Sequence, residues 1–337
     1  MDFWSKLFEL ICTPSFVFSV LRYTTPILFA ALGGLMARRC GIMNLALEAS
    51  LLTSALFAVI ASAFTKKAVL GGISVAAADA ALLAKANFAA TWAGFIVGSL
   101  SGMLIALFLA YMAVGLKADA YLAGLAINTM ASGGTVFILY MAAGEKGVSA
   151  SLDSGLMPVI NIPVIKDIPV LGEIISGHNF MTYFSWICVG IVYFILFKTA
   201  TGLRIRAVGE TPSAAESVGV NVKKVQYIAM AFSGLFCGFG GVSMSMALVQ
   251  MFTRGMSAGK GFIAMSAMNL GNAAPIGTTI AAFLFGFFES VALVMQSLSI
   301  PVQFVQAIPY VATLVGLVVF AIQSENKVKK LKAKQAK

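Results

Sequence analysis

The sequence predicts an all-α membrane protein with about eight to ten transmembrane helices. Six long stretches carry no Asp, Glu, Lys or Arg: 86–116, 120–144, 174–197, 225–253, 261–288 and 290–324. A helix of about 20 apolar residues crosses the hydrocarbon core of a bilayer. Hydrophobic residues make up 60% of the chain and charged residues 11%, whereas a soluble domain has about 25% charged residues. The apolar stretches are continuous and do not alternate with period two, so a β-barrel is excluded.

The expected spans follow one another along most of the chain. In order, they lie near 14–37, 42–63, 88–116, 120–142, 180–199, 225–250, 256–271, 276–298 and 303–322. Charged residues interrupt the Ala-rich segment 65–87, which therefore fits either an external helix or a tenth span. We expect residues 1–325 to form a single transmembrane domain and 326–337 to form a basic tail.

Basic residues near span ends mark the cytoplasmic side of a membrane protein. Six lysines follow Glu325, and five more basic residues flank or lie in the loop 200–224: Lys198, Arg204, Arg206, Lys223 and Lys224. We therefore expect the tail and this loop to be cytoplasmic, where they also meet anionic lipid headgroups. The net charge of +10 is attributed to topology and not to nucleic-acid binding. The loop 143–179, rich in Pro and Gly, is then external.

Two stripes of small residues predict close helix packing. Ala90, Gly94, Gly98 and Gly102 recur every four residues in one span, and Gly234 and Gly238 repeat the spacing in another. Small side chains let helix backbones approach closely, so that dispersion holds them together in lipid.

Asn44 and Glu48 stand at the expected start of the second span, in MARRCGIMNLALEAS (36–50). They are four residues apart, so a helix would place both on one face. A carboxylate inside a membrane is costly unless it faces a cavity or a partner, which makes Glu48 a candidate for function. The alternative is that Glu48 pairs with Arg38, Arg39 or another span and locks the bundle.

Asn128 lies inside an uncharged span, in KADAYLAGLAINT (117–129). A lone amide in a membrane helix either bonds two helices together or belongs to a polar pathway. The sequence leaves both interpretations open.

The segment 254–276 is expected to contain a broken helix. Several helix-weakening residues fall within it: Gly255, Gly259, Gly261, Gly271 and Pro275. Broken helices at membrane depth are tolerated where they line a cavity, as in transporters. Ser257, Lys260 and Phe262 would then border a pathway, although a kink that serves packing alone gives the same pattern.

The segment TGLRIRAVGETPSAAESVGVNVKK (201–224) predicts a short cytoplasmic helix between two spans. Thr211 can cap its N-terminus, Pro212 suits its first position and Gly219 would end it. A short amphipathic helix presented in this way is suited to docking in a groove of a partner.

This segment resembles the coupling-helix region of ABC-importer permeases of the branched-chain amino-acid/simple-sugar superfamily. GLRIRAVGETPSAAESVGVNV is closest to the simple-sugar and nucleoside branch, whose loop reads approximately G-L-R-x-R-A-V-G-E-N-P-x-A-A-x-x-x-G-I. Four further segments agree in order: TPILFAALGGLMARRCGIMNLALE (25–48), LKADAYLAGLAIN (116–128), MSAGKGFIAMSAMNLGNAAPIG (256–277) and IPYVATLVGLVV (308–319). The chain departs from the family pattern before Gly41 and after Gly271, and 65–87 looks like an insertion.

The resemblance implies a half-transporter in the inner membrane of a bacterium, with a cytoplasmic C-terminus. It would pair with a second, often non-identical permease subunit and receive cargo from an extracytoplasmic substrate-binding protein. This chain would hold no cofactor, because a separate cytoplasmic subunit binds ATP. The matching motif implies ATPase contact for Arg204, Arg206, Gly209, Glu210, Pro212, Ala214, Ala215 and Gly219. The polar positions Asn44, Glu48 and Asn128 become candidates for the pathway.

Other functions fit the sequence less well. No GxxxxGK[ST] motif occurs in the sequence, so the chain lacks the phosphate-binding loop of an ATPase. A secondary transporter would need ion-coupling carboxylates in its spans, and only Glu48 and Glu289 are available. An intramembrane enzyme would need a catalytic constellation that the spans lack. Among ABC cargoes, nucleosides or simple sugars are expected, with riboflavin-like compounds and branched-chain amino acids as alternatives.

Overall fold

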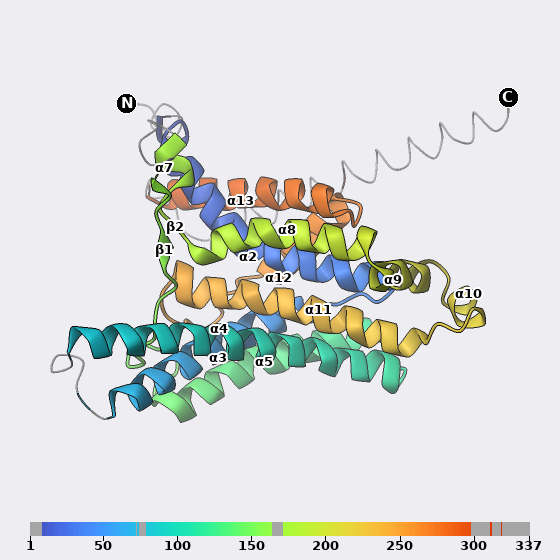
Figure 1. Ribbon diagram of the computed structural model, residues 1–337, viewed down its shortest axis with the longest axis horizontal. Coiled ribbons are helices and arrows are strands. Elements are labelled where there is room, and N and C mark those ends of the chain that lie inside the picture. The colour runs from blue at the N-terminus through green and yellow to red at the C-terminus, as the bar shows by residue number, and fades with distance from the viewer. Residues whose placement is uncertain are drawn as a thin grey trace.

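The computed structural model describes residues 9–71, 73, 79–163, 171–297, 311 and 318. Its helices lie side by side in one bundle, with β1, β2 and α7 at one end and α9 and α10 at the other (Figure 1). The elements in chain order are α2 (Pro14–Arg39), α3 (Leu47–Leu70), α4 (Ala80–Ala110), η1 (Tyr111–Gly115), α5 (Ala120–Ala143), β1 (Val159–Ile160), α7 (Leu171–Ile175), β2 (His178–Asn179), α8 (Phe180–Lys198), α9 (Ala200–Glu210), α10 (Pro212–Ser217), α11 (Val222–Val242), η2 (Ser243–Leu248), α12 (Lys260–Leu270) and α13 (Pro275–Ser297).

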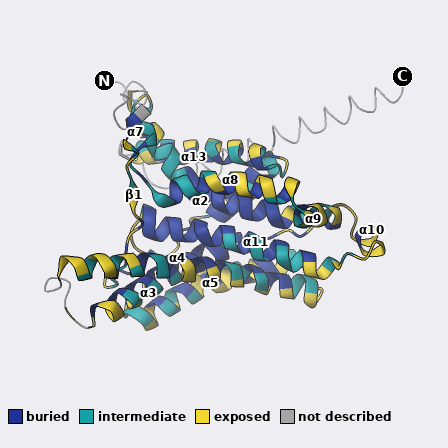
Figure 2. Ribbon diagram, viewed as in Figure 1, coloured by how far each residue is buried: buried dark blue, intermediate teal, exposed yellow. Residues whose placement is uncertain are grey.

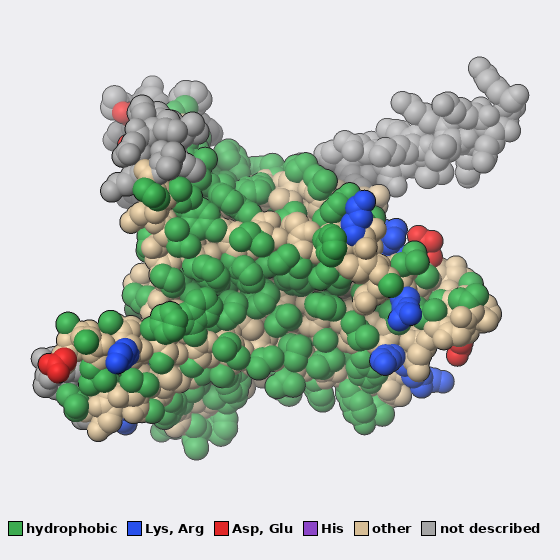
Figure 3. Space-filling model, in the orientation of Figure 1, with side chains coloured by type: hydrophobic (Ala, Val, Ile, Leu, Met, Phe, Trp, Pro, Cys, Tyr) green, Lys and Arg blue, Asp and Glu red, His purple; other side chains and the backbone are tan. Residues whose placement is uncertain are grey.

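The all-α membrane fold is confirmed. Among the described residues, seven helical segments are long and apolar enough to cross a membrane: Pro14–Arg39, Leu47–Leu70, Ala80–Gly115, Ala120–Ala143, Phe180–Lys198, Val222–Leu248 and Pro275–Gln296. The visible surface is apolar over the middle of the bundle, and charged side chains gather toward its two ends (Figure 3). The span expected at 303–322 lies outside the described residues apart from Val311 and Val318.

The segment 65–87 is neither a separate helix nor a tenth span where the structure describes it. α3 continues to Leu70, where Gly71 adopts φ +60° and ends the helix in a left-handed cap. α4 begins at Ala80. The charged residues of this segment therefore belong to the ends of two neighbouring helices, which project at one end of the bundle (Figure 1).

The predicted packing of small residues is confirmed in α4 and α11. A Cβ on Gly102 would lie 2.7 Å from the Cα of Gly238, and one on Gly98 would lie 2.7 Å from the Cβ of Ala58 in α3. α4 thus contacts α11 and α3 through its glycine stripe. Direct backbone contact of this kind maximises dispersion where lipid supplies no hydrophobic driving force.

α2 forms the centre of the bundle. All its residues from Thr24 to Ala37 are buried, and they appear as an almost unbroken dark stretch in Figure 2. Pro26 stands inside this helix, and a Cβ on Gly240 of α11 would lie 3.1 Å from its carbonyl oxygen. α11, α12 and α13 all pack against α2.

Candidate functional site

The chain between α2 and α3 is not helical, although the sequence predicted a span over 42–63. Residues 42–45 have no regular secondary structure, and α3 begins only at Leu47. The prediction that Asn44 and Glu48 share one helix face was therefore wrong, because Asn44 precedes the helix. Its Nδ2 donates to Ser233 Oγ at 2.9 Å. Ser233 lies near the middle of the Val222–Leu248 span, so this non-helical backbone lies at mid-membrane depth.

Asparagine side chains provide the hydrogen bonds that this interrupted backbone lacks. Asn44 Oδ1 accepts from the N–H of Ala46 at 3.0 Å. From α5, Asn128 Oδ1 accepts from the N–H of Ala49 at 2.9 Å, and its Nδ2 donates to the carbonyl of Leu45 at 2.8 Å. Backbone polar groups inside a membrane need such partners because water is absent. Both asparagines therefore stabilise the start of α3.

The broken helix predicted in 254–276 is present, but the span expected at 256–271 is not. α12 has 11 residues and is about 16 Å long, roughly half the hydrocarbon thickness. Gly259 precedes it with φ +76°, a conformation that glycine adopts without steric cost. α12 is therefore a half-helix that starts inside the membrane.

Glu48 joins the start of α3 to the start of α12. Its Oε1 accepts from the N–H of Gly259 at 2.8 Å, and its Oε2 accepts from the N–H of Gly261 at 2.7 Å. Free N–H groups and the helix dipole make a helix N-terminus favourable for an anion. A Cβ on Gly261 would lie 2.5 Å from the backbone nitrogen of Glu48, so only glycine allows this approach. The Glu48 carboxylate thus occupies the anion-binding position at the N-terminus of α12.

Lys260 points away from this carboxylate and toward α13. Its Nζ lies 2.6 Å from Oε1 of Glu289, and the two side chains are 10% and 15% exposed. Both carboxylates that an ion-coupled mechanism would need are therefore already engaged, Glu48 by backbone N–H groups and Glu289 by Lys260. Ser257 is buried at 2% exposure, whereas Phe262 is 40% exposed on α12.

The structure thus brings Asn44, Glu48 and Asn128 together around the start of α3. Sequence reasoning did not single out Ser233, and it named Lys260 and Glu289 separately without pairing them. The isolated carboxylate of Glu289 in a predicted span was a usable signal, because a buried charge needs a partner. Nothing distinguished Ser233 from the other serines of the chain.

The segment 200–224 contains two helices instead of the expected loop with one. α9 covers the first part, and α10 (Pro212–Ser217) is the predicted short helix. Pro212 is in the first turn as predicted, but the Thr211 side chain makes no capping bond. Gly219 adopts φ +82°, and its N–H donates to the carbonyl of Glu216 at 2.9 Å. α10 projects at one extremity of the bundle (Figure 1).

The eight residues matched to the coupling motif divide by exposure. Arg204, Glu210, Pro212, Ala214 and Gly219 are exposed, and Ala215 is buried at 5%. Arg206 is half-buried, with its guanidinium carbon 5.0 Å from the ring centroid of Phe197. Gly209 packs closely against the backbone of Arg39 and Cys40. The exposed members are free to meet a partner, and the others fix the segment to the bundle.

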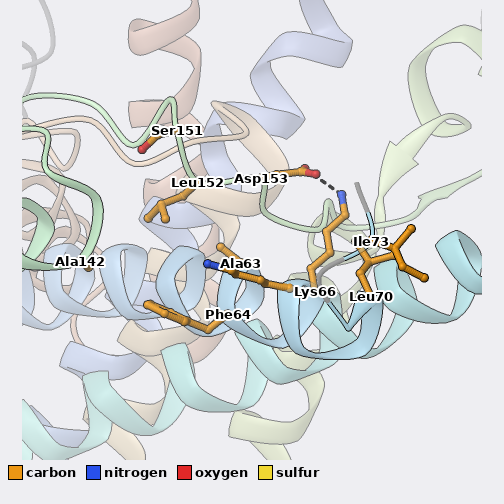
Figure 4. A pocket seen from close by; sticks show the side chains of 10 residues that line it. Ala63, Phe64, Lys66, Leu70, Ile73, Ala142, Ser151, Leu152 and Asp153 are labelled. Atoms are coloured by element: carbon orange, nitrogen blue, oxygen red, sulfur yellow. Dashed lines mark hydrogen bonds and ion pairs between the residues drawn. The ribbon is translucent and has the colours of Figure 1, made fainter. Parts of the chain in front are cut away.

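Two cavities lie away from this mid-membrane site. One, of about 360 Å³, is at the end opposite α10, between α3, the end of α5 and residues 151–153 (Figure 4). Lys66 lines it and pairs with Asp153 at 2.7 Å. The other, of about 440 Å³, lies beside α10 and is lined by Met43, Glu216 and Lys223, among others. The second cavity therefore lies between α10 and the chain that leads to Asn44.

A bundle of apolar spans with the short helix α12 packed among them is the architecture of a membrane transport protein of the permease type. The chain belongs to the family described as branched-chain amino acid transport system / permease component, which matches residues 16–322.

Several permeases are similar to the chain over most of their length. The guanosine ABC transporter permease protein NupQ of Bacillus subtilis is 34% identical over 90% of both chains. The nucleoside ABC transporter permease protein NupC of Lactococcus lactis is 32% identical over 90% of this chain and 91% of its own. The putative glucose ABC transporter permease protein TsgC13 of Haloferax volcanii is 30% identical over 84% of this chain and 78% of its own. No solved structure matches the chain.

Proposed function

We propose that this chain is the membrane-spanning subunit of an ATP-driven importer for nucleosides in a bacterial inner membrane. The similarity to NupQ and NupC, which covers nine tenths of the chain, carries this proposal. A separate cytoplasmic subunit binds and hydrolyses ATP, and an extracytoplasmic binding protein delivers the cargo. The C-terminus and α10 face the cytosol, because basic residues surround both.

The site favours an uncharged cargo. Helix N-termini inside a membrane attract anionic substrate groups in many transporters. Here the Glu48 carboxylate already accepts from the first N–H groups of α12. A phosphorylated cargo would meet this fixed negative charge, whereas a nucleoside would not. Asn44, Glu48 and Asn128, with Ser257, Lys260 and Phe262 of the α12 region, border the pathway in this proposal.

A second permease subunit completes the transporter. Two permease proteins of Bacillus subtilis named for guanosine, NupQ and NupP, are both similar to this chain, at 34% and 26% identity. Lactococcus lactis likewise has NupC and NupB. These pairs support a heterodimer of related permeases.

ATP energy reaches the bundle through α10. The exposed residues Arg204, Glu210, Pro212, Ala214 and Gly219 contact the ATPase, and Arg206, Gly209 and Ala215 hold the segment in place. α10 is short, projects from the bundle and is exposed on all residues except Ala215. A projecting helix of this kind can enter a groove of a partner and transmit its motion.

Uptake by the complete transporter in proteoliposomes tests the proposal. The experiment uses radiolabelled guanosine, with glucose and a branched-chain amino acid as competitors. We expect that uptake requires ATP on the cytoplasmic side, is unaffected by a protonophore and is inhibited only by nucleosides. Uptake driven by an ion gradient without ATP would reject the ABC mechanism, and inhibition by glucose or the amino acid alone would reject the nucleoside assignment.

A further inference from the structure

Arg39, the last residue of α2, holds the far end of α12. Its Nε donates to the carbonyl of Ala273 at 2.7 Å. Ala273 belongs to the tight turn between α12 and α13, where Asn272 and Ala273 have φ +53° and +48°. Two successive non-glycine residues in the left-handed region persist only where the surroundings hold them. The Arg39 guanidinium is part of what holds this turn.

Gly209, near the end of α9, contacts the turn that carries Arg39. A Cβ on Gly209 would overlap the carbonyl group of Arg39 and lie 3.2 Å from the carbonyl carbon of Cys40. From the other side, a Cβ on Gly41 would lie 3.4 Å from the Cα of Gly209. The two segments therefore meet backbone to backbone. Arg206 and Glu210 also lie within electrostatic reach of Arg39.

α12 is thus held at both ends by different helices. Glu48 of α3 binds its first N–H groups, and Arg39 of α2 binds the turn that follows it. A short, hydrogen-bonded helix moves as a rigid body, and close-packed backbone contacts transmit displacement because they do not compress. A shift of α9 and α10 therefore displaces the turn at 39–41, and with it Ala273.

We propose that Arg39 is a positioning residue that transmits movement of the segment 200–219 to the half-helix α12. This inference rests on the proposed function, which makes that segment the contact of the ATPase. It assigns the transmission step to one hydrogen bond, Arg39 Nε to the carbonyl of Ala273. Glu48, at the other end of α12, couples the same movement to the start of α3.

A cysteine reporter on α12 tests the inference in the complete transporter. Ser266, partly exposed on α12, is replaced as Ser266→Cys, and the exposed Cys12 is removed as Cys12→Ser. Cys188 and Cys237 are buried, and burial raises the pKa of Cys40 to about 12, so its thiol stays protonated at neutral pH. The thiol modification rate at position 266 is measured with and without ATP.

The comparison is between Arg39→Met, which has no donor at the position of Nε, and Arg38→Met, which removes the exposed neighbouring arginine. With Arg39 intact, ATP should change the modification rate, and Arg38→Met should preserve this change. Arg39→Met should reduce the ATP-dependent change by about tenfold or more, the scale of one hydrogen bond from a charged donor. ATP hydrolysis should continue, since the ATPase contact itself is intact.

Two results would overturn the inference: an ATP response in Arg39→Met as large as in Arg38→Met, or no response with Arg39 intact. If Arg39→Met does not co-purify with the ATPase, Arg39→Gln is measured instead, because glutamine keeps an N–H donor on Cδ and should retain the response. Loss of the response in Arg39→Gln would then overturn the inference. Failure of the proposed function is seen separately, as absence of ATP-driven nucleoside uptake by the protein with Arg39 intact.

Discussion

Glu48 and Gly261 connect two helices that both begin inside the membrane. Glu48 Oε2 lies 2.7 Å from the backbone nitrogen of Gly261, and α3 and α12 extend from this contact toward opposite ends of the bundle. One carboxylate thereby satisfies N–H groups that lipid could not.

Replacing Glu48 should destabilise the protein in proportion to the acceptors lost. Glu48→Ala leaves the N–H groups of Gly259 and Gly261 without an acceptor and should cost about 2–4 kcal/mol. Glu48→Gln keeps one acceptor oxygen and should cost roughly half as much. Thermal unfolding of the purified protein in detergent measures both. Equal stability of the two variants would contradict the bidentate role.

Asn128→Leu should destabilise more than Thr129→Val on the same helix. The first change removes the partners of the Ala49 N–H and the Leu45 carbonyl, with an expected cost of about 2–4 kcal/mol. Thr129 is exposed, and Thr129→Val should change the free energy of unfolding by less than about 0.5 kcal/mol. Hydrogen exchange at the start of α3 should rise only in Asn128→Leu. Unchanged exchange there would show that α3 begins without this support.

The stability losses caused by replacing Lys260 and Glu289 should be strongly non-additive. Lys260→Met or Glu289→Leu alone leaves a buried unpaired charge, at a cost of about 3–5 kcal/mol. The double variant Lys260→Met/Glu289→Leu leaves no charge and should recover most of that loss. A double-mutant cycle by thermal unfolding measures the coupling. Additive losses would mean that the two side chains act independently.

Gly238→Ala should separate α4 from α11. Its Cβ would lie 2.5 Å from the carbonyl oxygen of Ser99, so the helices must move apart, at a cost of about 1–3 kcal/mol. Gly190→Ala on α8 is the control, since no described heavy atom lies within 4 Å of its Cβ position. Thermal unfolding in detergent should show the loss only in Gly238→Ala. Equal thermal stability of the two variants would exclude tight packing at Gly238.

Hydrophobic runs and small-residue stripes predicted much of this fold from the sequence. The stripe through Gly98 and Gly102 identified the α4 contacts because packing in lipid depends on side-chain size along one face. The helix break near Gly259 was visible for a similar reason, since glycine weakens a helix locally. Pro212 and Gly219 likewise marked the region of α10 by their backbone preferences.

The connections between distant segments could not be predicted in the same way. Residues 42–45 are apolar enough for a helix except at Asn44, and their non-helical backbone is held by hydrogen bonds that involve Asn44, Asn128 and Ser233. The partners of Glu48 are backbone N–H groups, which every residue except proline possesses, so side-chain chemistry gave no clue. The sequence suggested arginine partners for Glu48, and the structure shows that Arg39 bonds Ala273 instead.

Cross-linking from Ser217→Cys to the cytoplasmic ATPase tests the central claim most directly. Ser217 is exposed at the end of α10, the helix assigned to ATPase contact. The assay places a bifunctional thiol reagent on either side of sealed vesicles that contain the complete transporter. We predict a covalent adduct with the ATPase only when the reagent reaches the cytoplasmic face. Modification of position 217 only from the extracytoplasmic face would contradict the account.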